Sequence, residues 1–372
     1  MSIFPFSRKK EVLGIDLGTS NIKVLELKLA KDKLTVKNFA EKQLNDWAIK
    51  DKSTHERQQI YIKELKKIIS ENNFSTKKAA VSISGSSVIV RFVKFPKMEP
   101  EDLEKTLQFE AEPHIPFNIQ EVDMDTQIIG DVEEDGQTLM ETILVASKND
   151  TIAERVEIIE KAGLNPAVID VDAFALENAY SLLKDIDSKM ILLVNIGAST
   201  TNISIIENGV SKVVRDLYTA GISFTREIQN SLKLEGPAEA EKLKIKYGLT
   251  GKKSPADQGE DAIGSGNTAS RIYDILHPVV RELNSEIQRS IDYFSGQQTD
   301  HEVNIEKIVL SGGTSALKGL SEFVEKDLGI PVEIFRPLKD ANTKNFNGEI
   351  NKRSPAYAVI TGLAIREIGD HK

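Results

Sequence analysis

Three short glycine-rich turns carry the residues best suited to hold phosphate. They are GIDLGTSNIK at 14–23, NIGASTTNI at 195–203 and SGGTSALKGL at 311–320, and each follows a run of apolar residues that predicts a buried strand. A glycine at the end of a strand can adopt backbone angles that a side chain would forbid, so the N–H groups of such a turn can point at phosphate oxygens. Each turn alone is typical of an ordinary tight connection. Three of them along one chain predict a nucleotide-binding cleft.

The composition restricts the partners and the chemistry that the chain can have. The net charge is −9 and the pI is about 5.3, which disfavours nucleic acid because binding a phosphate backbone needs a positive field. There is no cysteine, which excludes disulfides and thiol nucleophiles, and the five histidines show no metal-binding spacing. No stretch approaches the roughly 18 apolar residues of a membrane span. We therefore expect a cytoplasmic protein.

The strand patterns around the first two turns predict a duplicated fold. Three strands are predicted around the first turn, at 12–16, 22–29 and 34–39, and three around the second, at 191–194, 203–206 and 210–214. Aligning Asp16 with Asn195, and Gly18 with Gly197, matches the two sets if the second loop is two residues longer. That alignment places Asn21-Ile22 opposite Asn202-Ile203. A chain of 372 residues is too long for one compact unit, so we expect two large lobes.

Residues 79–150 show a separate pattern between the two halves. It consists of strands at 79–83 and 88–95, a helix at 101–112 and a hairpin that turns at Asp135-Gly136. Further on, helices are predicted at 151–162, 173–183 and 271–294, with a strand at 167–171. The Gly/Ser-rich segment 251–270 has almost no apolar residues and predicts a loop. Residues 79–150 are therefore expected to form an inserted subdomain.

These turns, in this order, resemble those of the actin-like ATPases over nearly the whole chain. More narrowly, four blocks are similar to the PilM family of cytoplasmic proteins of type IV pilus assembly: LGIDLGTSNIKVLEL at 13–27, FPKMEPEDLEKTLQFEAEPHIPF at 95–117, KAGLNPAVIDVDAFALENAY at 161–180 and RIYDILHPVV at 271–280. The resemblance implies an α/β actin-like ATPase fold, with duplicated ribonuclease-H-like lobes and an inserted FtsA-like 1C (SHS2-like) subdomain. The implied domains are 1–78, 151–190 and 350–372 for the first lobe (1A), 79–150 for the subdomain, and 191–349 for the second lobe (2A/2B).

The resemblance also implies a site for ATP and Mg²⁺. The first turn would bind the β- and γ-phosphates through Gly18, Thr19, Ser20, Asn21 and Lys23, and the second would close over them with Gly197, Ala198, Ser199 and Thr200. Asp16 would hold Mg²⁺ through water, as this hard cation keeps much of its hydration shell. The adenosine would lie against Gly312, Gly313, Thr314 and Leu317, with Glu241 and Lys244 reaching the ribose and base and Gly221 preceding the next helix. Without the family, Glu241 and Lys244 would be assigned to a solvated helix face.

Asn195 departs from the family pattern. Actin-like hydrolases have an Asp at the start of the second phosphate turn, where it helps to position Mg²⁺ and the attacking water. An amide cannot supply that negative charge, and losing a positioned acid–base group commonly costs about 10²–10⁴-fold in rate. We therefore expect ATP binding with slow or negligible hydrolysis.

The partner implied by the resemblance is the cytoplasmic N-terminal segment of PilN, bound in a groove between the first lobe and the inserted subdomain. Other pilus assembly platform proteins are also implied, with the inner membrane reached only through such partners. Two alternatives stay open. One is a small-molecule kinase, for which Asp170 or Asp172 could be the base, although a carboxylate at a strand end is more often a helix cap. The other is an FtsA-like filament-forming cell-division protein, although the amphipathic helix that ends FtsA is missing from this sequence.

Overall fold

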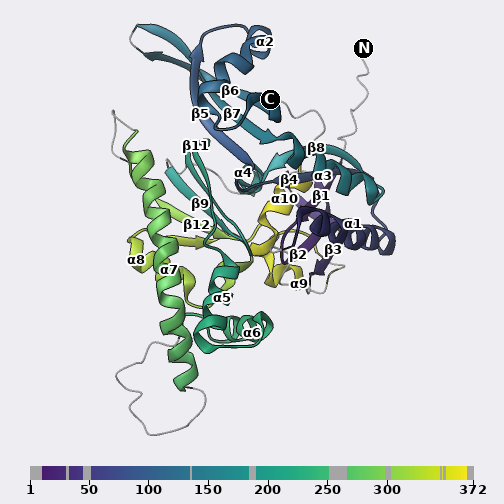
Figure 1. Cartoon of the computed structure of the whole chain (residues 1–372), viewed down its shortest axis with the longest axis vertical. Coiled ribbons are helices and arrows are strands. Elements are labelled where there is room, and N and C mark those ends of the chain that lie inside the picture. The colour runs from purple at the N-terminus through teal and green to yellow at the C-terminus, as the bar shows by residue number, and fades with distance from the viewer. Residues whose placement is uncertain are drawn as a thin grey trace.

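The structure is a computed structural model in which two similar sheets stand side by side (Figure 1). It describes residues 11–30, 33–44, 52–134, 136–183, 190–250, 266–297, 303–343, 346 and 349–366. Within these ranges no helix combines the length and the apolar character needed to cross a bilayer.

The sheet of the first lobe has the strand order β3-β2-β1-β4-β8. Its strands are β1 (Leu13–Leu17), β2 (Asn21–Ala30), β3 (Lys33–Gln43), β4 (Lys78–Ile83) and β8 (Asn165–Val171). The first three, which match the three strands predicted around the first turn, are antiparallel, and β4 and β8 run parallel to β1. Helices α1 (Thr54–Glu71) and α3 (Asn149–Lys161) cover one face with an apolar core. On the other face lie α4 (Asp172–Leu183) and α10 (Ala358–Ala364).

The sheet of the second lobe repeats this order as β11-β10-β9-β12-β13. Its strands are β9 (Met190–Ile196), β10 (Thr201–Glu207), β11 (Val210–Leu217), β12 (Lys307–Ser311) and β13 (Val332–Ile334). Its helices are α5 (Gly221–Leu232), α6 (Pro237–Tyr247), α7 (Gly266–Ser295) and α8 (Leu320–Leu328). The start of α7 shows that 266–270 are helical and not part of a loop, whereas 251–265 lie outside the described residues.

The predicted repeat is present, but its alignment was wrong by two residues. Asp16 pairs with Lys23 across β1 and β2, and Asn195 pairs with Asn202 across β9 and β10, so the two loops have equal length. The counterpart of Asn202 is therefore Lys23. Strand register is set by which side chains face the core. The prediction had instead matched the two Asn-Ile pairs, which do not occupy equivalent places in the strands.

The inserted subdomain is a three-stranded antiparallel sheet with the order β5-β7-β6. It contains β5 (Val88–Pro96), α2 (Pro100–Ala111), η2 (Glu112–His114), η3 (Ile119–Glu121), β6 (Val122–Glu134) and β7 (Gln137–Lys148). Leu103 and Ala111 of α2 pack on one face of this sheet. Gly136 has φ +74° in the predicted hairpin, while Asp135 lies outside the described residues.

Two of the predicted domain boundaries were wrong. Residues 79–83 form most of β4, which pairs with β1 and β8, so the subdomain starts only after Ile83. At the other end, chain before residue 350 already belongs to the first lobe: Leu338 packs in its core and the N–H of Asn342 donates to the carbonyl of Leu34. The short helices α9 (Glu349–Lys352) and η5 (Ser354–Tyr357) then lead into α10. In both places tertiary packing, and not local pattern, decides the boundary.

Candidate functional site

The first and second turns meet between the two lobes. The hydroxyl of Thr19 donates a hydrogen bond to the hydroxyl of Ser199 at 3.1 Å, across 180 residues of sequence. Both side chains are half-buried. The structure thus brings the two turns into contact, and we call the region around them, between the lobes, the cleft.

In the first turn, the backbone bends sharply at a glycine and one carboxylate is paired. A Cβ on Gly18 would lie 2.9 Å from the carbonyl oxygen of Asn21, so this turn excludes a side chain there. Lys23 Nζ contacts Asp16 Oδ2 at 2.6 Å, with both side chains mostly buried. The amide of Asn21 is turned toward β3, where it donates to Glu41 at 2.8 Å. The carbonyl of Ser20 accepts from the N–H of Leu44.

In the second turn, the same backbone carries amides in place of the ion pair. A Cβ on Gly197 would lie 2.9 Å from the carbonyl oxygen of Thr200, as at Gly18. Asn195 Nδ2 donates to Asn202 Oδ1 at 2.8 Å, and Asn202 Nδ2 donates to Asp216 Oδ1 at 2.7 Å. The carbonyl of Ala198 accepts from the N–H of Ile222 at 2.7 Å, which joins the turn to the start of α5.

The third turn packs directly against the second. Thr314, in η4 (Gly313–Ala316), donates from its hydroxyl to the carbonyl of Gly197 at 2.9 Å, and the N–H of Gly221 donates to the same carbonyl at 3.0 Å. Gly312 has φ +84°, and a Cβ there would lie 2.4 Å from the carbonyl oxygen of Ile196. The site residues Gly221, Gly312, Gly313 and Thr314 are therefore gathered around one corner of the cleft.

Three predicted adenosine contacts are already engaged within the second lobe. Lys244 is buried, which lowers the pKa of its amine, and its Nζ contacts Glu241 Oε2 at 2.6 Å and the carbonyl of Gly221 at 3.1 Å. Glu241 also accepts from the hydroxyl of Thr225 at 2.6 Å. Leu317 is buried in the core of the lobe. Glu241 and Lys244 thus lie beside Gly221, where they fix the start of α5, and the side chain of Leu317 packs inward.

Two carboxylates near the turns were not predicted as nucleotide ligands. Asp172 was named only as a possible kinase base, and Asp216 was not named. Asp172, in the first turn of α4, accepts a hydrogen bond from Ser82; burial, followed by the negative charge of Asp16, raises its pKa to about 6. Asp216 lies opposite Asn202 across β10 and β11, and no motif marks it. Asp170, the other candidate base, is 3.4 Å from Arg366, and burial raises its pKa.

The residues present fit a magnesium ion held through water better than one held directly. Asp16 Oδ2 is taken by Lys23, and Oδ1 lies next to Gly18, where a Cβ would be 3.4 Å away. Over the described part of the chain, no three His, Cys, Asp or Glu side chains gather to hold a metal. One carboxylate oxygen at the turn suits a hydrated Mg²⁺, which commonly keeps several of its waters.

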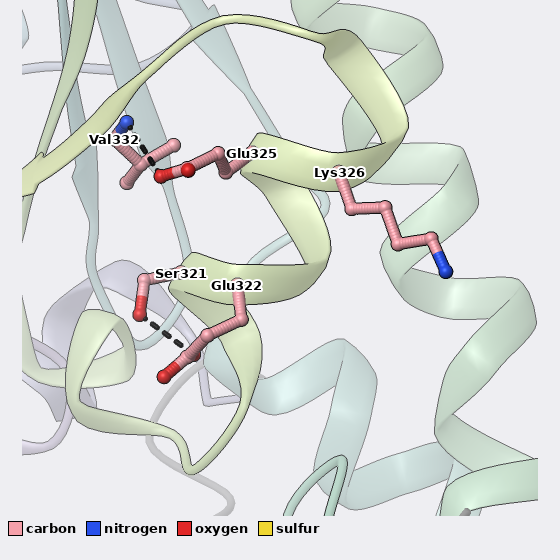
Figure 2. Close-up of a pocket in the computed structure, with 5 residues that line it drawn as sticks. All are labelled: Ser321, Glu322, Glu325, Lys326 and Val332. Carbon is pink, nitrogen blue, oxygen red and sulfur yellow. Dashed lines mark hydrogen bonds between the residues drawn. The ribbon is translucent and has the colours of Figure 1, made fainter.

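Two surface hollows lie outside this cleft. One, of about 360 Å³, is lined by Ser321, Glu322, Glu325, Lys326 and Val332 of α8 and β13 (Figure 2). Its carboxylates serve the local structure, since Glu325 accepts from the N–H of Val332 at 3.1 Å. The other, of about 240 Å³, lies where all three parts of the molecule meet. It is lined by 85, 86 and 88–91 at the entry to the inserted subdomain, Val171 of the first lobe, and 214–216 and 218 of the second. We call it the junction groove.

Comparisons with known proteins agree with this architecture. The family model described as type IV pilus assembly protein PilM matches residues 14–368. A solved PilM–PilN type IV pilus biogenesis complex aligns with a TM-score of 0.79 at 26% identity, covering 96% of this chain and 99% of that chain. The ethanolamine utilization protein EutJ of Carboxydothermus hydrogenoformans aligns with a TM-score of 0.52 at 16% identity, covering 98% and 91%. The fold is therefore the actin-like ATPase fold, as predicted.

Curated relatives match only part of the chain. The cell division protein FtsA of Pseudomonas aeruginosa is 27% identical over 215 residues, which are 55% of this chain and 48% of FtsA. FtsA of Neisseria meningitidis is 27% identical over 213 residues, 55% of this chain and 49% of that protein. The chain thus spans about half the length of the curated relatives it matches.

Proposed function

The chain belongs to the PilM family of type IV pilus assembly proteins, and on this basis we propose that it is an ATP-binding scaffold with slow or no hydrolysis, holding the cytoplasmic N-terminal segment of PilN at the inner membrane. One observation carries the proposal: the second turn faces the first through Thr19 and Ser199 but presents the amide of Asn195 where a hydrolase has a carboxylate. The second turn thus offers donors to phosphate and carries no carboxylate at the position of Asn195.

Each part of the cleft has a task in this proposal. The N–H groups of both turns, the hydroxyls of Thr19 and Ser199, and the ammonium of Lys23 would receive the phosphates, because donors and positive charge attract phosphate oxygens. Asp16 would orient Mg²⁺ through a water, and the bound ion would offset phosphate charge. The third turn and α6 would enclose the adenosine. ATP would then stabilise the closed arrangement of the lobes in proportion to its occupancy.

The partner segment is assigned to the junction groove. Apolar residues such as Val90, Val171 and Val214 meet there, and the groove borders β5 and β11, each an edge strand of its sheet. An extended peptide is a suitable occupant, because an edge strand can add a further strand. The match to a PilM–PilN complex supports PilN as the source of that peptide. Other pilus assembly platform proteins would contact the exposed surfaces.

Calorimetric titrations test both halves of the proposal. Mg-ATP is expected to bind, and Asp16→Ala to weaken binding about tenfold or more, because the hydrated cation loses its carboxylate. Asp123→Ala, at an exposed carboxylate of β6, is the control and should change nothing. If the wild type fails to bind ATP at millimolar concentration, the nucleotide half is refuted.

The peptide half is tested by removing one wall of the groove. The N–H of Lys148 donates to the carbonyl of Ser87, so 88–147 can be replaced by a short Gly-Ser linker. The shortened chain should lose the PilN peptide while still binding ATP, which serves as its folding control. A PilN peptide that binds this variant with unchanged affinity would refute the assignment.

A small-molecule kinase is the second candidate, favoured by the partly buried Asp172 beside Asp16. A carboxylate whose pKa lies near neutrality is suited to accept a proton from an attacking hydroxyl. ATP consumption that appears only when a hydroxylated small molecule is added would favour this reading. Intact peptide binding without such consumption favours the scaffold. An FtsA-like filament former would instead sediment when ATP is added.

A further inference from the structure

A short series of hydrogen bonds joins the second phosphate turn to the junction groove. Asn195 Oδ1 accepts from the hydroxyl of Ser311 at 3.4 Å, and the amides of Asn195 and Asn202 lead to Asp216. Asp216 Oδ2 then accepts from the backbone N–H of Gly85, 131 residues away, at the entry to the inserted subdomain. Asn195, Asn202 and Asp216 stand opposite one another on three adjacent strands. One carboxylate thus contacts both the turn and the groove.

The chemistry of Asp216 decides how the two amides are oriented. A carboxylate only accepts hydrogen bonds, so Asn202 must direct its NH₂ group at Asp216 and its oxygen at Asn195. Asn195 must in turn give its NH₂ group to Asn202, which leaves its oxygen toward Ser311. A neutral group at position 216 would remove this restriction, because an amide can both donate and accept. Asp216 therefore selects which atom of Asn195, itself the first residue of the second turn, faces Ser311 at the start of the third turn.

The strand that carries Asp216 is also the contact of the second lobe with the inserted subdomain. Val214 of β11 packs in one apolar cluster with Val90 of β5 and Val171 of β8. Lys212 Nζ contacts Glu141 of β7 at 3.1 Å. In Figure 1, β11 lies below the inserted sheet and beside the lower end of β5. A shift of β11 would therefore move one wall of the groove against the other.

We propose that Asp216 is a positioning residue that couples the second phosphate turn to the junction groove, so that nucleotide and partner peptide alter each other's affinity. The coupling rests on the proposed function, because it needs both ligands. The coupling uses direct hydrogen bonds only. Asn195 of the turn binds the amide of Asn202, Asn202 binds the carboxylate of Asp216, and that carboxylate holds the backbone N–H of Gly85 at the groove. By linkage, the factor by which ATP changes peptide affinity equals the factor by which the peptide changes ATP affinity.

The first experiment measures this factor by titration with Mg-ATP and with a synthetic peptide of the cognate PilN N-terminal segment. In the wild type, the dissociation constant of each ligand should change by about fivefold or more when the other is saturating. In Asp216→Asn and in Asn202→Ala, this ratio should fall to about one, whatever the separate affinities become. Asp274→Asn, an exposed residue of α7 with the same change of charge, should keep the wild-type ratio.

Each outcome of these titrations is decisive. A wild type that binds both ligands independently, or an Asp216→Asn variant that keeps the full ratio, overturns the coupling and leaves the proposed function intact. A wild type that binds neither ligand overturns the proposed function, and the coupling with it. The single-ligand titrations separate the two failures.

The second experiment follows the Gly85 end without the peptide. Amide hydrogen exchange of a fragment that starts at or before residue 82 and covers Gly85 should slow on addition of Mg-ATP to the wild type, since such a fragment reports the N–H held by Asp216. The same ATP-dependent change should be absent from Asp216→Asn at ATP concentrations that saturate it. Equal ATP-dependent protection in that variant would overturn the proposal.

Discussion

The two phosphate turns have the same backbone and different charge. A Cβ on Gly18 and one on Gly197 would lie at the same distance from the carbonyl oxygen three residues further on. The strand pairing also gives the two loops the same length. Across the first sheet, Asp16, Lys23 and Glu41 stand opposite one another on β1, β2 and β3. Across the second, the same places hold Asn195, Asn202 and Asp216. The duplicated fold has kept its geometry and exchanged an ion pair for two amides.

The carboxylates on the edge-side strands of the two sets, Glu41 and Asp216, have comparable tasks. Glu41 holds the chain near the third turn, because it accepts from Arg353 at 2.8 and 2.9 Å and from the hydroxyl of Tyr357 at 3.0 Å. Asp216 holds Gly85 at the inserted subdomain. The difference between the lobes is thus confined to the inner positions, on the two strands that flank each turn. Next to the turns, the carboxylates therefore belong to the first lobe, as Asp16 and Asp172, whereas Asp216 takes the outer position in the second lobe.

The largest effect is expected at Gly312, where the backbone of the third turn packs against that of the second. Gly312→Ala should destabilise the protein by about 3 kcal/mol, because the φ of +84° and ψ of 163° at this residue form a conformation that essentially only glycine adopts, at a cost of roughly 1–3 kcal/mol, and the new Cβ must displace the carbonyl of Ile196. Urea unfolding measures the change. Gly313→Ala is the control, since its Cβ would meet only Ala356 at 4.0 Å. Equal losses at both positions would contradict the account.

Restoring the first-turn pair in the second turn should sharpen the comparison. The double substitution Asn195→Asp with Asn202→Lys is expected to raise the ATP turnover by about tenfold or more, because a positioned carboxylate is commonly worth 10²–10⁴-fold. Phosphate release measures the rate. Asn195→Leu should give no gain, as it adds no charge. A double variant that binds ATP but is no faster would show that charge at this position does not limit the rate.

The acidic side of the cleft predicts a pH dependence. Because the folded-state pKa of Asp172 is raised from 3.8 to about 6, the folded protein binds this proton more tightly than the unfolded chain does. Its contribution to stability is complete below pH 4 and is lost as the pH rises through about 6. The variant Asp172→Asn does not lose this stability, because an amide at position 172 does not titrate. The stability of that variant relative to wild type should therefore increase by about 2 kcal/mol between pH 4 and pH 7.

The control for this titration is Asp123→Asn, at an exposed carboxylate of β6. Its stability relative to wild type should not vary with pH in this way. Thermal or urea unfolding of the three proteins over the same pH range measures the differences. A constant difference between wild type and Asp172→Asn would contradict the raised pKa.

The smallest effect is expected at the direct contact between the turns. Thr19→Val keeps the shape of the side chain and removes the hydrogen bond to Ser199, whose net worth is about 0.5–1.5 kcal/mol. A loss of this size should lower the affinity for ATP by roughly tenfold or less. Small-angle scattering should also show a larger average separation of the two lobes in the variant. Thr54→Val, at the exposed first residue of α1, is the matched control. An unchanged scattering profile and affinity would show that the contact does not help to close the cleft.

Much of the fold followed from local pattern. The strands around Gly18 and Gly197 are formed by alternating or continuous apolar residues, and the glycines mark where the chain must bend, so duplication could be predicted. The shift of two residues between the copies could not, because two Asn-Ile pairs offered a plausible alignment that only the strand register excludes. Strand β4 was assigned to the wrong unit, since its sequence does not reveal that its neighbours are β1 and β8.

The site residues also separate into those that the sequence pointed to and those that only the structure revealed. The sequence pointed to Asp16 and to the amide at Asn195, because both stand at fixed places in recognisable turns. Asp216 carried no such mark, and no pattern indicated that Lys244 would contact the carbonyl of Gly221. A hydrogen-bond partner is chosen by the packing of whole strands and helices, which no short segment contains.

The sequence by itself determined where the chain forms strands, where glycine must end them, and which of the two turns carries the negative charge, because these depend on neighbours along the backbone. The tertiary structure alone decided that Thr19 meets Ser199, that burial, and then the charge of Asp16, raises the pKa of Asp172, and that Asp216 holds Gly85. The two residues of each of these three pairs are between 131 and 180 positions apart in the sequence. Only the burial of apolar faces between the lobes fixes such distances.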